Sequence, residues 1–344
     1  MRVGIIGASG YTGLELVRCV LRHPKFELVA VTSEQRAGLA LGDAFPGFRG
    51  LVDLRFEAVD PDALASRLDC AFVALPHGAS AKVVSALHKA GVAVVDLSAD
   101  FRLQSREVFE KWYGEHAAPE LFGQAVYGLP ELHRDELPGA RLIAAPGCYP
   151  TSAILPAAPF LRAGVVESAG LFVDSKSGVS GAGRKLDDGL LLAEIGENAR
   201  AYSVAAHRHG PEIEQELGLV GGQAVSVSFV PQLIPVVRGI LTTVGLRPVQ
   251  PITTAEAQAL LEAAYADAPF VRVLPVGEFP SLQAVRGSNF CDVAVVSDER
   301  AGTLLALSAL DNLVKGSGGQ AIQAFNLAQG WPETTGLWEA PWLP

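Results

Sequence analysis

The sequence predicts an α/β protein of two domains, in which a parallel sheet with helices on both faces precedes a mixed α+β domain. Two observations predict the first domain: short apolar stretches typical of buried strands alternate with helical patterns, and the earliest strand runs into a glycine-rich turn. A third observation predicts the second domain, because strands that alternate apolar and polar residues follow one another in the later half with fewer helices between them.

Composition limits the classes of function. The 344 residues suffice for two domains of ordinary size, and 49% of them are hydrophobic, so the chain can bury a core. A net charge of -10 argues against non-specific binding to nucleic acid or to an anionic membrane surface. No apolar stretch is long enough to span a membrane, and the first residues lack the pattern of a signal peptide. Four scattered cysteines indicate neither a disulfide framework nor a metal site, so we expect a cytoplasmic protein that acts on small molecules.

The first strand, Val3–Ile6, leads directly into glycines with the spacing GxxGxxG. A helical pattern follows, and a second strand is expected over Leu28–Thr32. This order suits dinucleotide binding, because the glycines let the backbone approach a pyrophosphate at the helix N-terminus. The first domain is therefore predicted to be a Rossmann-type dinucleotide-binding domain. Its turn is predicted to hold the cofactor through Gly7, Ser9, Gly10, Tyr11, Thr12 and Gly13.

The end of the second strand bears on which dinucleotide is bound. NAD sites usually place an acidic residue there to hold the ribose 2′-hydroxyl. Here Ser33 and Arg36 could hold a 2′-phosphate, whereas Glu34 would repel one if its carboxylate pointed inward. This arrangement favours NADP(H), although Arg36 can also be interpreted as a solvated loop charge.

Further strands extend the predicted parallel sheet. Cys70–Leu75 and Val92–Leu97 read as buried strands that flank a helical pattern. Ligands of such sheets lie at the carboxyl ends of the strands, so Pro76 and His77 are expected to border the cofactor. Asp100 follows the second of these strands. His77 and Asp100 have an alternative interpretation, which is that they cap helices and turns.

Cys148 lies between a buried-looking strand, Arg141–Ala145, and an apolar run from Ser152 that is expected to be a helix. Pro150 suits a first helical turn, because its missing N–H has no helical partner to lose. Helix N–H groups and the helix dipole favour an anion there, so the pKa of the thiol is expected to fall. We therefore expect Cys148 to be a thiolate nucleophile in a cleft between the domains. The alternative is a small buried hydrophobic residue, as many free cysteines are.

Two later stretches have compositions suited to catalysis. Residues 177–185 combine small residues with Arg184 and Lys185, so their backbone N–H groups can form an anion-binding nest and Arg184 can clamp an oxyanion. The alternative is a flexible surface loop.

His207 and His209 precede a helix that begins with proline, where a histidine can act as general acid or base beside a thiolate. No metal site is expected, because no third ligand follows at metal spacing. Substrate contacts are expected from Ser177, Gly181, Arg184, His207 and Glu212.

The domain boundary is expected close to the cysteine, with an NADP-binding domain over residues 1–147 and a catalytic and oligomerisation domain over residues 148–311. A last helix, within residues 312–328, is expected to return to the first domain. Asp311 or Asn312 is expected to cap this helix.

The whole chain resembles the N-acetyl-gamma-glutamyl-phosphate reductase family of arginine biosynthesis. The resemblance covers residues 1 to about 332 and rests on motifs at 7–13 (GASGYTG), 96–102 (DLSADFR), 146–151 (PGCYPT), 177–185 (SGVSGAGRK), 207–209 (HRH) and 311–316 (DNLVKG). The family implies a semialdehyde-dehydrogenase-like fold, NADP(H) and a homotetramer. It also implies that Cys148 is the nucleophile, that His209 is the acid/base with His207 as fallback, and that Asn312 lies near the nicotinamide.

The reaction that this resemblance implies is the NADPH-dependent reduction of N-acetyl-L-glutamyl 5-phosphate to N-acetyl-L-glutamate 5-semialdehyde and phosphate, through a thioester on Cys148. Two related activities are alternatives. Enzymes that reduce carrier-protein-linked aminoadipyl or glutamyl phosphate differ at the cysteine turn and at the end of the anion loop. Aspartate-semialdehyde dehydrogenase usually has Asn where this chain has Gly147. A non-enzymatic NADP-binding sensor is the alternative from another class.

Overall fold

The computed structural model describes residues 1–184 and 186–343. Lys185, the second cation expected in the anion loop, lies outside the described residues. The chain divides into two compact units, residues 1–146 with 317–337 and residues 147–316 with 338–344. The first is built on a parallel sheet and the second on a mixed sheet, which confirms the predicted fold class.

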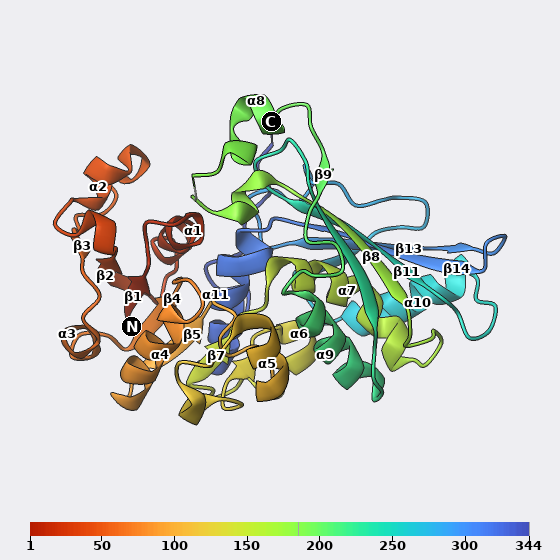
Figure 1. Cartoon of the computed structure of the whole chain (residues 1–344), viewed down its shortest axis with the longest axis horizontal. Helices are drawn as coiled ribbons and strands as arrows, with labels where there is room; N and C mark the ends of the chain where they lie inside the picture. Colours follow the sequence, from red (N-terminus) through yellow and green to blue (C-terminus); the bar gives the residue numbers. More distant parts are fainter. Residues whose placement is uncertain (185, 344) are drawn as a thin grey trace. The chain divides into compact units, whose positions relative to one another are not determined.

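All strand pairs of the first unit are parallel, in the order β3-β2-β1-β4-β5-β7-β6 (Figure 1). Reading from β3 to β5, this is the doubly wound order that places the glycine-rich turn after the central strand. Its strands are β1 (Arg2–Ile6), β2 (Glu27–Thr32), β3 (Phe56–Glu57), β4 (Cys70–Val73), β5 (Ala93–Asp96), β6 (Val126–Tyr127) and β7 (Leu142–Ala144). Its helices are α1 (Tyr11–Val20), η1 (Glu34–Arg36), α2 (Leu41–Ala44), η2 (Pro46–Phe48), α3 (Pro61–Ala65), α4 (Ala79–Lys89), α5 (Arg106–Tyr113), η3 (Pro119–Leu121), α6 (Pro130–His133) and α11 (Gly319–Ala328).

The central strands of this sheet are buried on both faces, as helices on both sides require. Every residue of β4 and of β5 is buried. Because such strands are continuous apolar runs, the sequence predicts them well. The two-residue strands β3 and β6 carry too little pattern to predict. Helix α5 was missed although Ser105 caps its N-terminus.

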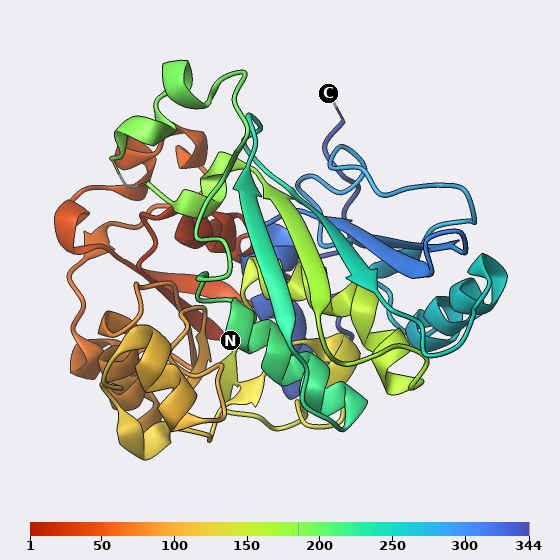
Figure 2. The same ribbon diagram turned by 45° about the vertical axis from the view of Figure 1, so that its right-hand side comes forward.

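The second unit has a seven-stranded mixed sheet in the order β12-β13-β14-β11-β8-β10-β9. Figures 1 and 2 both show β8, β10 and β11 side by side. Its strands are β8 (Leu171–Ser177), β9 (Arg200–Ala201), β10 (Val227–Leu233), β11 (Ile240–Leu246), β12 (Val271–Val273), β13 (Cys291–Asp298) and β14 (Thr303–Leu310). Its helices are α7 (Cys148–Arg162), η4 (Val179–Ala182), η5 (Asp188–Leu190), α8 (Leu192–Ile195), α9 (Gly210–Gly221), α10 (Thr254–Tyr265) and the π-helical turn η6 (Val314–Gly318).

Helix α7 begins at Cys148, four residues before the predicted start at Ser152, and it contains two internal prolines. Pro156 and Pro159 cannot donate to the carbonyls four residues before them. Neighbouring side chains satisfy both carbonyls: Ser308 Oγ donates to Ser152 O at 2.6 Å, and Tyr265 Oη donates to Leu155 O. The apolar helix therefore keeps its buried backbone groups satisfied despite the prolines.

The chain leaves the second unit through a π-helical turn and not through the single regular helix expected over Leu313–Leu327. The Asp311 carboxylate accepts the N–H groups of Leu313 (2.8 Å) and Val314 (3.3 Å), so Asp311 caps this turn as predicted. The regular helix α11 starts only at Gly319 and packs in the first unit, where Asn326 Oδ1 and His23 Nε2 lie 3.0 Å apart. Among the residues that the structure describes, no helix is both long and apolar enough to cross a membrane.

Candidate functional site

The glycine-rich turn between β1 and α1 contains one glycine that the protein's own packing does not require. A Cβ on Gly13 would lie 2.6 Å from Ala8 Cα, so this glycine lets the helix pack closely on the turn. A Cβ on Gly10 would meet only the Gly7 carbonyl oxygen, at an ordinary 3.8 Å. Gly10 caps a ten-residue helix with no acidic residue in its first turn. The bare backbone at Gly10 therefore fits a phosphate of a dinucleotide.

The residues after β2 lie where a dinucleotide-binding fold places its contacts to the ribose. Ser33 is buried and its Oγ lies 2.9 Å from Ser9 Oγ, which ties the end of β2 to the glycine-rich turn. The Glu34 carboxylate accepts the N–H of Val59 at 2.8 Å, so it is occupied by the backbone. The Arg36 guanidinium lies 5.0 Å from the centre of the Phe45 ring.

The structure separates the roles of the residues that follow β4 and β5. Asp100 is buried and accepts the N–H groups of Gly78 (2.8 Å) and Ala81 (2.9 Å), so it caps α4, as the alternative interpretation held. Pro76 and His77 are exposed, and the His77 ring stands 5.6 Å from that of Tyr113. Pro76 and His77 are therefore accessible to a ligand, whereas the side chain of Asp100 is not.

Cys148 is the first residue of the 15-residue helix α7 and is partly exposed. Two contacts fix its position. The buried Glu212 of α9 accepts the N–H of Gly147 at 2.8 Å, so this carboxylate holds the residue before the cysteine. A Cβ on Gly316 would lie 2.8 Å from Cys148 Cβ, so the π-helical turn packs directly behind the cysteine. Glu212, which was expected to contact substrate, is thus placed to position the nucleophile.

Cys148 opens into a pocket of about 320 Å³ that is formed by residues of the second unit alone. The pocket brings together Cys148, His207, His209, Ser177 and Gly181, all of which were predicted from the sequence to form the site. Arg184 is exposed and is not among the lining residues. The described lining contains no group of three potential metal ligands.

The two histidines differ in their environment. His207 Nδ1 accepts the N–H of His209 at 3.1 Å, and its ring is surrounded by those of Tyr149, Tyr202 and Phe229. Burial, with a smaller contribution from the charge of Arg208, lowers the pKa of His207 to about 4. His207 is therefore neutral at physiological pH, and its Nδ1 is already an acceptor. These properties favour His209 as the group that carries a proton during turnover.

A pair of tyrosines forms one wall of the pocket. Tyr149 Oη and Tyr202 Oη lie 2.9 Å apart. Burial raises the pKa of both phenols, that of Tyr202 to about 12, so both keep their protons at neutral pH. They can orient a polar ligand through hydrogen bonds, and they are unsuited to act as bases.

The anion loop is organised differently from the nest that was expected. The N–H groups of Gly178, Val179 and Ser180 donate to backbone carbonyls of the segment 236–239, at 2.9 to 3.0 Å. Those of Gly181 and Gly183 donate to carbonyls within the loop. Because these five N–H groups are already hydrogen-bonded, they do not form the anion-binding nest that was expected, and that prediction is wrong for these residues. The loop instead presents Ser177 and the backbone of Gly181 and Ala182 to the pocket.

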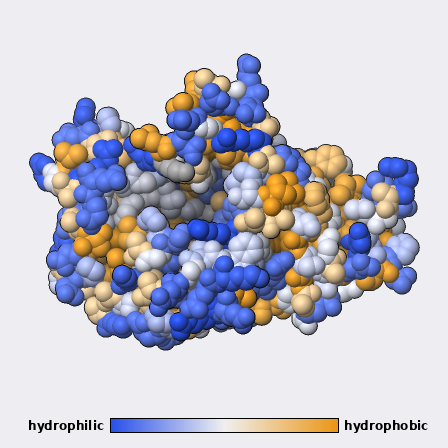
Figure 3. Space-filling view, viewed as in Figure 1, coloured by the Kyte–Doolittle hydropathy of each residue, from blue (hydrophilic) through white to orange (hydrophobic). Residues whose placement is uncertain are grey.

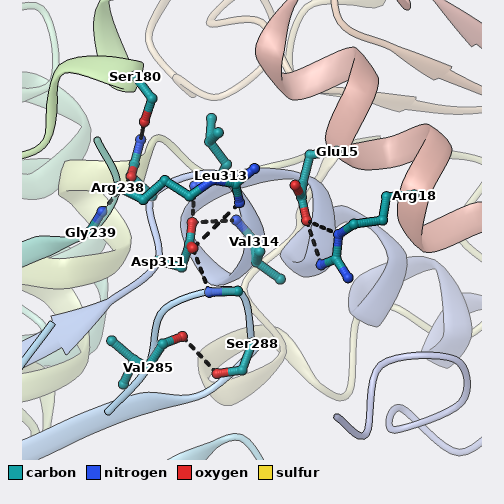
Figure 4. Close-up of polar contacts among 12 residues, drawn as sticks. Glu15, Arg18, Ser180, Arg238, Gly239, Val285, Ser288, Asp311, Leu313 and Val314 are labelled. Atoms are coloured by element: carbon teal, nitrogen blue, oxygen red, sulfur yellow. Dashed lines mark hydrogen bonds and ion pairs between the residues drawn. The ribbon is translucent and has the colours of Figure 1, made fainter. Parts of the chain in front are cut away.

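Asn312 supports this loop from the end of β14. Its Oδ1 accepts the N–H of Gly239 at 2.7 Å, and its Nδ2 donates to Ser180 Oγ at 2.9 Å. The neighbouring Asp311 is fully buried, and its carboxylate also accepts the N–H of Gly287 at 2.7 Å and pairs with Arg238 at 3.5 Å. Figure 4 shows these contacts converging on Asp311. The segment therefore anchors both the anion loop and the π-helical turn behind Cys148.

Sequence reasoning missed half of the pocket. Its remaining lining residues are Tyr149, Asp187, Leu190, Arg200, Tyr202 and Leu233. Tyr149 is the second residue of α7 and directly follows Cys148 in the sequence, which was the available signal for it. The others come from strand ends, a short 3₁₀ turn and irregular segments, where no periodic pattern marks a side chain as pocket-facing. For Arg200 and Tyr202, the available signal was their nearness to the two histidines in sequence.

Comparisons with known proteins agree on both units. Residues 2–140 match the family described as semialdehyde dehydrogenase, NAD binding domain, and residues 148–312 match semialdehyde dehydrogenase, dimerisation domain. Proteins named N-acetyl-gamma-glutamyl-phosphate reductase from Citrifermentans bemidjiense and Desulfotalea psychrophila are each 48% identical to this chain over 345 aligned residues, 100% of both chains.

One solved structure illustrates the shared fold. Aspartate semialdehyde dehydrogenase with NADP from Candida albicans superposes with a TM-score of 0.73, covering 96% of this chain and 99% of that chain. The sequence identity is 16%, so this likeness concerns the fold.

Proposed function

The chain belongs to the N-acetyl-gamma-glutamyl-phosphate reductase family of oxidoreductases, and we propose that it reduces N-acetyl-L-glutamyl 5-phosphate to N-acetyl-L-glutamate 5-semialdehyde with NADPH, in arginine biosynthesis. One observation carries the proposal. A cysteine at the first position of a long helix opens into a pocket that also contains two histidines. This arrangement suits acyl transfer to sulfur.

The first half of the proposed reaction forms a thioester. The Cys148 thiolate attacks the acyl carbon, the bond from that carbon to the phosphate oxygen breaks, and inorganic phosphate leaves. The N-terminus of α7 is placed to stabilise the charge that develops on the carbonyl oxygen. Ser177 and Gly181, at the start of the anion loop, are placed to contact the departing phosphate.

The second half reduces the thioester to the aldehyde. The dinucleotide, when bound, supplies a hydride to the thioester carbon. His209 protonates the resulting hemithioacetal oxygen and takes the proton back when the carbon–sulfur bond breaks, which frees the thiolate. His207 remains neutral and orients its neighbour through the hydrogen bond from the His209 N–H.

We assign the cofactor to the first unit. The turn from Gly7 to Gly13 would hold the pyrophosphate, and Ser33 with Arg36 would hold the 2′-phosphate of NADP(H). Pro76 and His77 complete the proposed cofactor contacts of this unit, whereas the amide of Asn312, expected near the nicotinamide, bonds to Gly239 and Ser180 in the second unit. One oxygen of the Glu34 carboxylate accepts the N–H of Val59, which supports the proposal that this side chain is directed to the backbone and not to the 2′-phosphate. The assembly is proposed to be a homotetramer.

An assay in the reverse direction tests the function. The purified chain is given NADP, phosphate and N-acetylglutamate semialdehyde, with aspartate semialdehyde as the control substrate, and NADPH absorbance is followed. Signal with the acetylated substrate alone is expected. Signal only with aspartate semialdehyde would show that the enzyme acts on a different semialdehyde and would contradict the proposed substrate. Silence with both, despite NADPH binding, would favour a carrier-linked substrate or a sensor.

A further inference from the structure

The positive charge inside the cysteine pocket comes from a residue that the sequence motifs do not include. Among the described residues that line this pocket, Arg200 is the only Lys or Arg. No hydrogen bond or ion pair joins its guanidinium to another described residue. Asp187 also lines the pocket, but its Oδ1 accepts the N–H of Gly189 at 3.0 Å and so belongs to the turn. The guanidinium is thus available to an anionic ligand.

The register of the mixed sheet fixes where Arg200 stands relative to the site of reaction. Arg200 on β9 pairs with Leu233 on β10, and Leu233 pairs in turn with Ser177 on β8. Residues paired directly across strands lie on one face, and all three line the pocket. Since neighbouring strands are about 4.8 Å apart, the backbone of Arg200 lies about 10 Å across the sheet from that of Ser177.

The backbone that carries Arg200 is unusual. The described non-glycine residues with positive φ are Glu197 (59°), Ser203 (45°) and Ala205 (53°), and all three flank Arg200 within this one segment. Side-chain-bearing residues adopt such angles at an energetic cost, and strain of this kind concentrates at functional sites. Hydrogen bonds from Tyr202 N to Pro231 O (3.1 Å) and from Ala205 N to Phe229 O (3.0 Å) hold the segment against β10.

Gly189 provides the space for this arginine. A Cβ on Gly189 would lie 2.5 Å from Arg200 Nη1, so a side chain at position 189 would displace the guanidinium. Strand pairing and the strained backbone therefore place the Arg200 backbone, and the space at Gly189 admits its guanidinium, in the pocket that also contains the reactive cysteine.

We propose that Arg200 is the specificity-determining residue that binds the α-carboxylate of the substrate. This role rests on the proposed function, and it means that the pocket recognises the α-carboxylate, which lies at the opposite end of the glutamyl chain from the reacting acyl carbon. In N-acetylglutamyl phosphate, four carbon–carbon bonds separate the acyl carbon from the α-carboxylate, which is roughly 5 Å. With the acyl carbon at Cys148 and the phosphate beside Ser177, the carboxylate extends toward the strand that carries Arg200. A guanidinium matches a carboxylate with two parallel hydrogen bonds.

The phosphate is the other anion that Arg200 could bind. It leaves from the acyl carbon itself, whereas Arg200 lies two strands away from Ser177 and is exposed at the sheet edge. This placement favours the α-carboxylate over the phosphate.

The test compares two aldehydes in the reverse assay: N-acetylglutamate semialdehyde and 4-acetamidobutanal, the same chain without the α-carboxylate. For Arg200→Gln we expect kcat/KM for the carboxylated aldehyde to fall about 100-fold and kcat/KM for 4-acetamidobutanal to stay within about twofold. Arg200→Lys should recover part of the loss, because a lysine keeps the charge without the planar fork. Arg247→Gln, which removes an exposed arginine outside the pocket, is the matched control and should change neither value.

The same measurement separates the ways in which the proposal can fail. Equal losses with both aldehydes and a raised KM for phosphate would assign Arg200 to the phosphate and overturn the inference alone. Unchanged kinetics in Arg200→Gln, with an active parent enzyme, would also overturn it. A parent enzyme that uses neither aldehyde would overturn the proposed function, and the carboxylate assignment would fall with it. NADPH binding and the thermal unfolding midpoint of each variant establish that it is folded.

Discussion

Cys148 differs from the other cysteines in its exposure. Cys19, Cys70 and Cys291 are 4%, 0% and 0% exposed, whereas Cys148 is partly exposed at a helix N-terminus. Burial also raises the pKa of Cys70, which further protects that thiol from alkylation. Both its position at a helix N-terminus and its exposure to solvent therefore indicate that Cys148 is the reactive thiol.

Iodoacetamide should consequently inactivate the enzyme by modifying Cys148 alone. Peptide mass spectrometry after partial inactivation should find the label at Cys148 in proportion to the lost activity, while Cys291→Ser should be inactivated at the parent rate. Labelling spread over several cysteines before activity is lost would contradict this picture.

The histidines permit a sharper comparison, because their environments differ while their sequence positions are nearly equivalent. His207 has a pKa of about 4, so it gains a proton only well below neutral pH. Substituting it removes a pocket wall and a hydrogen-bond acceptor but no proton carrier. His209→Asn should therefore lower kcat by several orders of magnitude more than His207→Asn.

The pH profile offers the decisive readout for this pair. If kcat changes with pH above about pH 5, the same pH dependence should remain in His207→Asn, because His207 is already deprotonated in that range. Equal losses of kcat in the two variants, or a limb that disappears in His207→Asn, would mean that the assignment of His209 is wrong.

Among the elements, the glycine-rich turn contains glycines that serve different purposes. Gly13→Ala would force a Cβ against Ala8 and should destabilise the first unit by about 1–3 kcal/mol. Gly10→Ala adds only an ordinary contact with the Gly7 carbonyl oxygen, so its unfolding midpoint should be nearly unchanged while the Kd for NADPH rises tenfold or more. Calorimetric unfolding and fluorescence titration of NADPH measure the two effects. Gly47→Ala, at an open position outside the turn, is the control for both. Unimpaired binding in Gly10→Ala would remove the main support for cofactor placement.

The elements also show where sequence patterns suffice. Buried parallel strands and the glycine-rich turn were predicted, since each has a continuous local signature. Helix α10 was missed, although Thr253 and Glu256 form a capping box that marks its start in the sequence. The sequence also gives no sign that α7 can accommodate its two internal prolines, because the freed carbonyls are satisfied by Ser308 and Tyr265 from distant parts of the chain. Such long-range compensation leaves no local pattern.

For the site, the sequence predicted which catalytic side chains meet in the pocket, but it did not predict how the surrounding backbone and strands are arranged. Cys148, Ser177, His207 and His209 do meet in one pocket. The nest, by contrast, could not be judged from composition, because three of its N–H groups donate to carbonyls of residues 236–239, about 60 positions later. Arg200 was missed because its role depends on the pairing of a two-residue strand.

At the scale of the whole molecule, the mixed sheet has a face suited to self-association. Along β8, Val173, Ser175 and Ser177 are buried, whereas Phe172 on the opposite face is 50% exposed. Figure 3, in the view of Figure 1, shows hydrophobic residues gathered around the strands labelled β8 and β11. The matched family is described as a dimerisation domain, and it covers this sheet.

Sedimentation velocity should therefore show an assembly larger than one chain, with a tetramer as the expected species. Phe172→Asp should shift the population toward smaller species without lowering the unfolding midpoint of the isolated chain. A monomeric parent protein at micromolar concentration would contradict the proposed assembly.

The most direct test of the account is acylation of Cys148 in the absence of NADPH. The chain is mixed with N-acetylglutamyl phosphate, and phosphate release is followed together with the intact mass of the protein. The thioester mechanism predicts a burst of phosphate equal to the concentration of active sites. It also predicts an acyl adduct that maps to Cys148, and both should be absent in Cys148→Ser. Phosphate release that requires NADPH, or a burst that persists in Cys148→Ser, would contradict the thioester on which the proposed function depends.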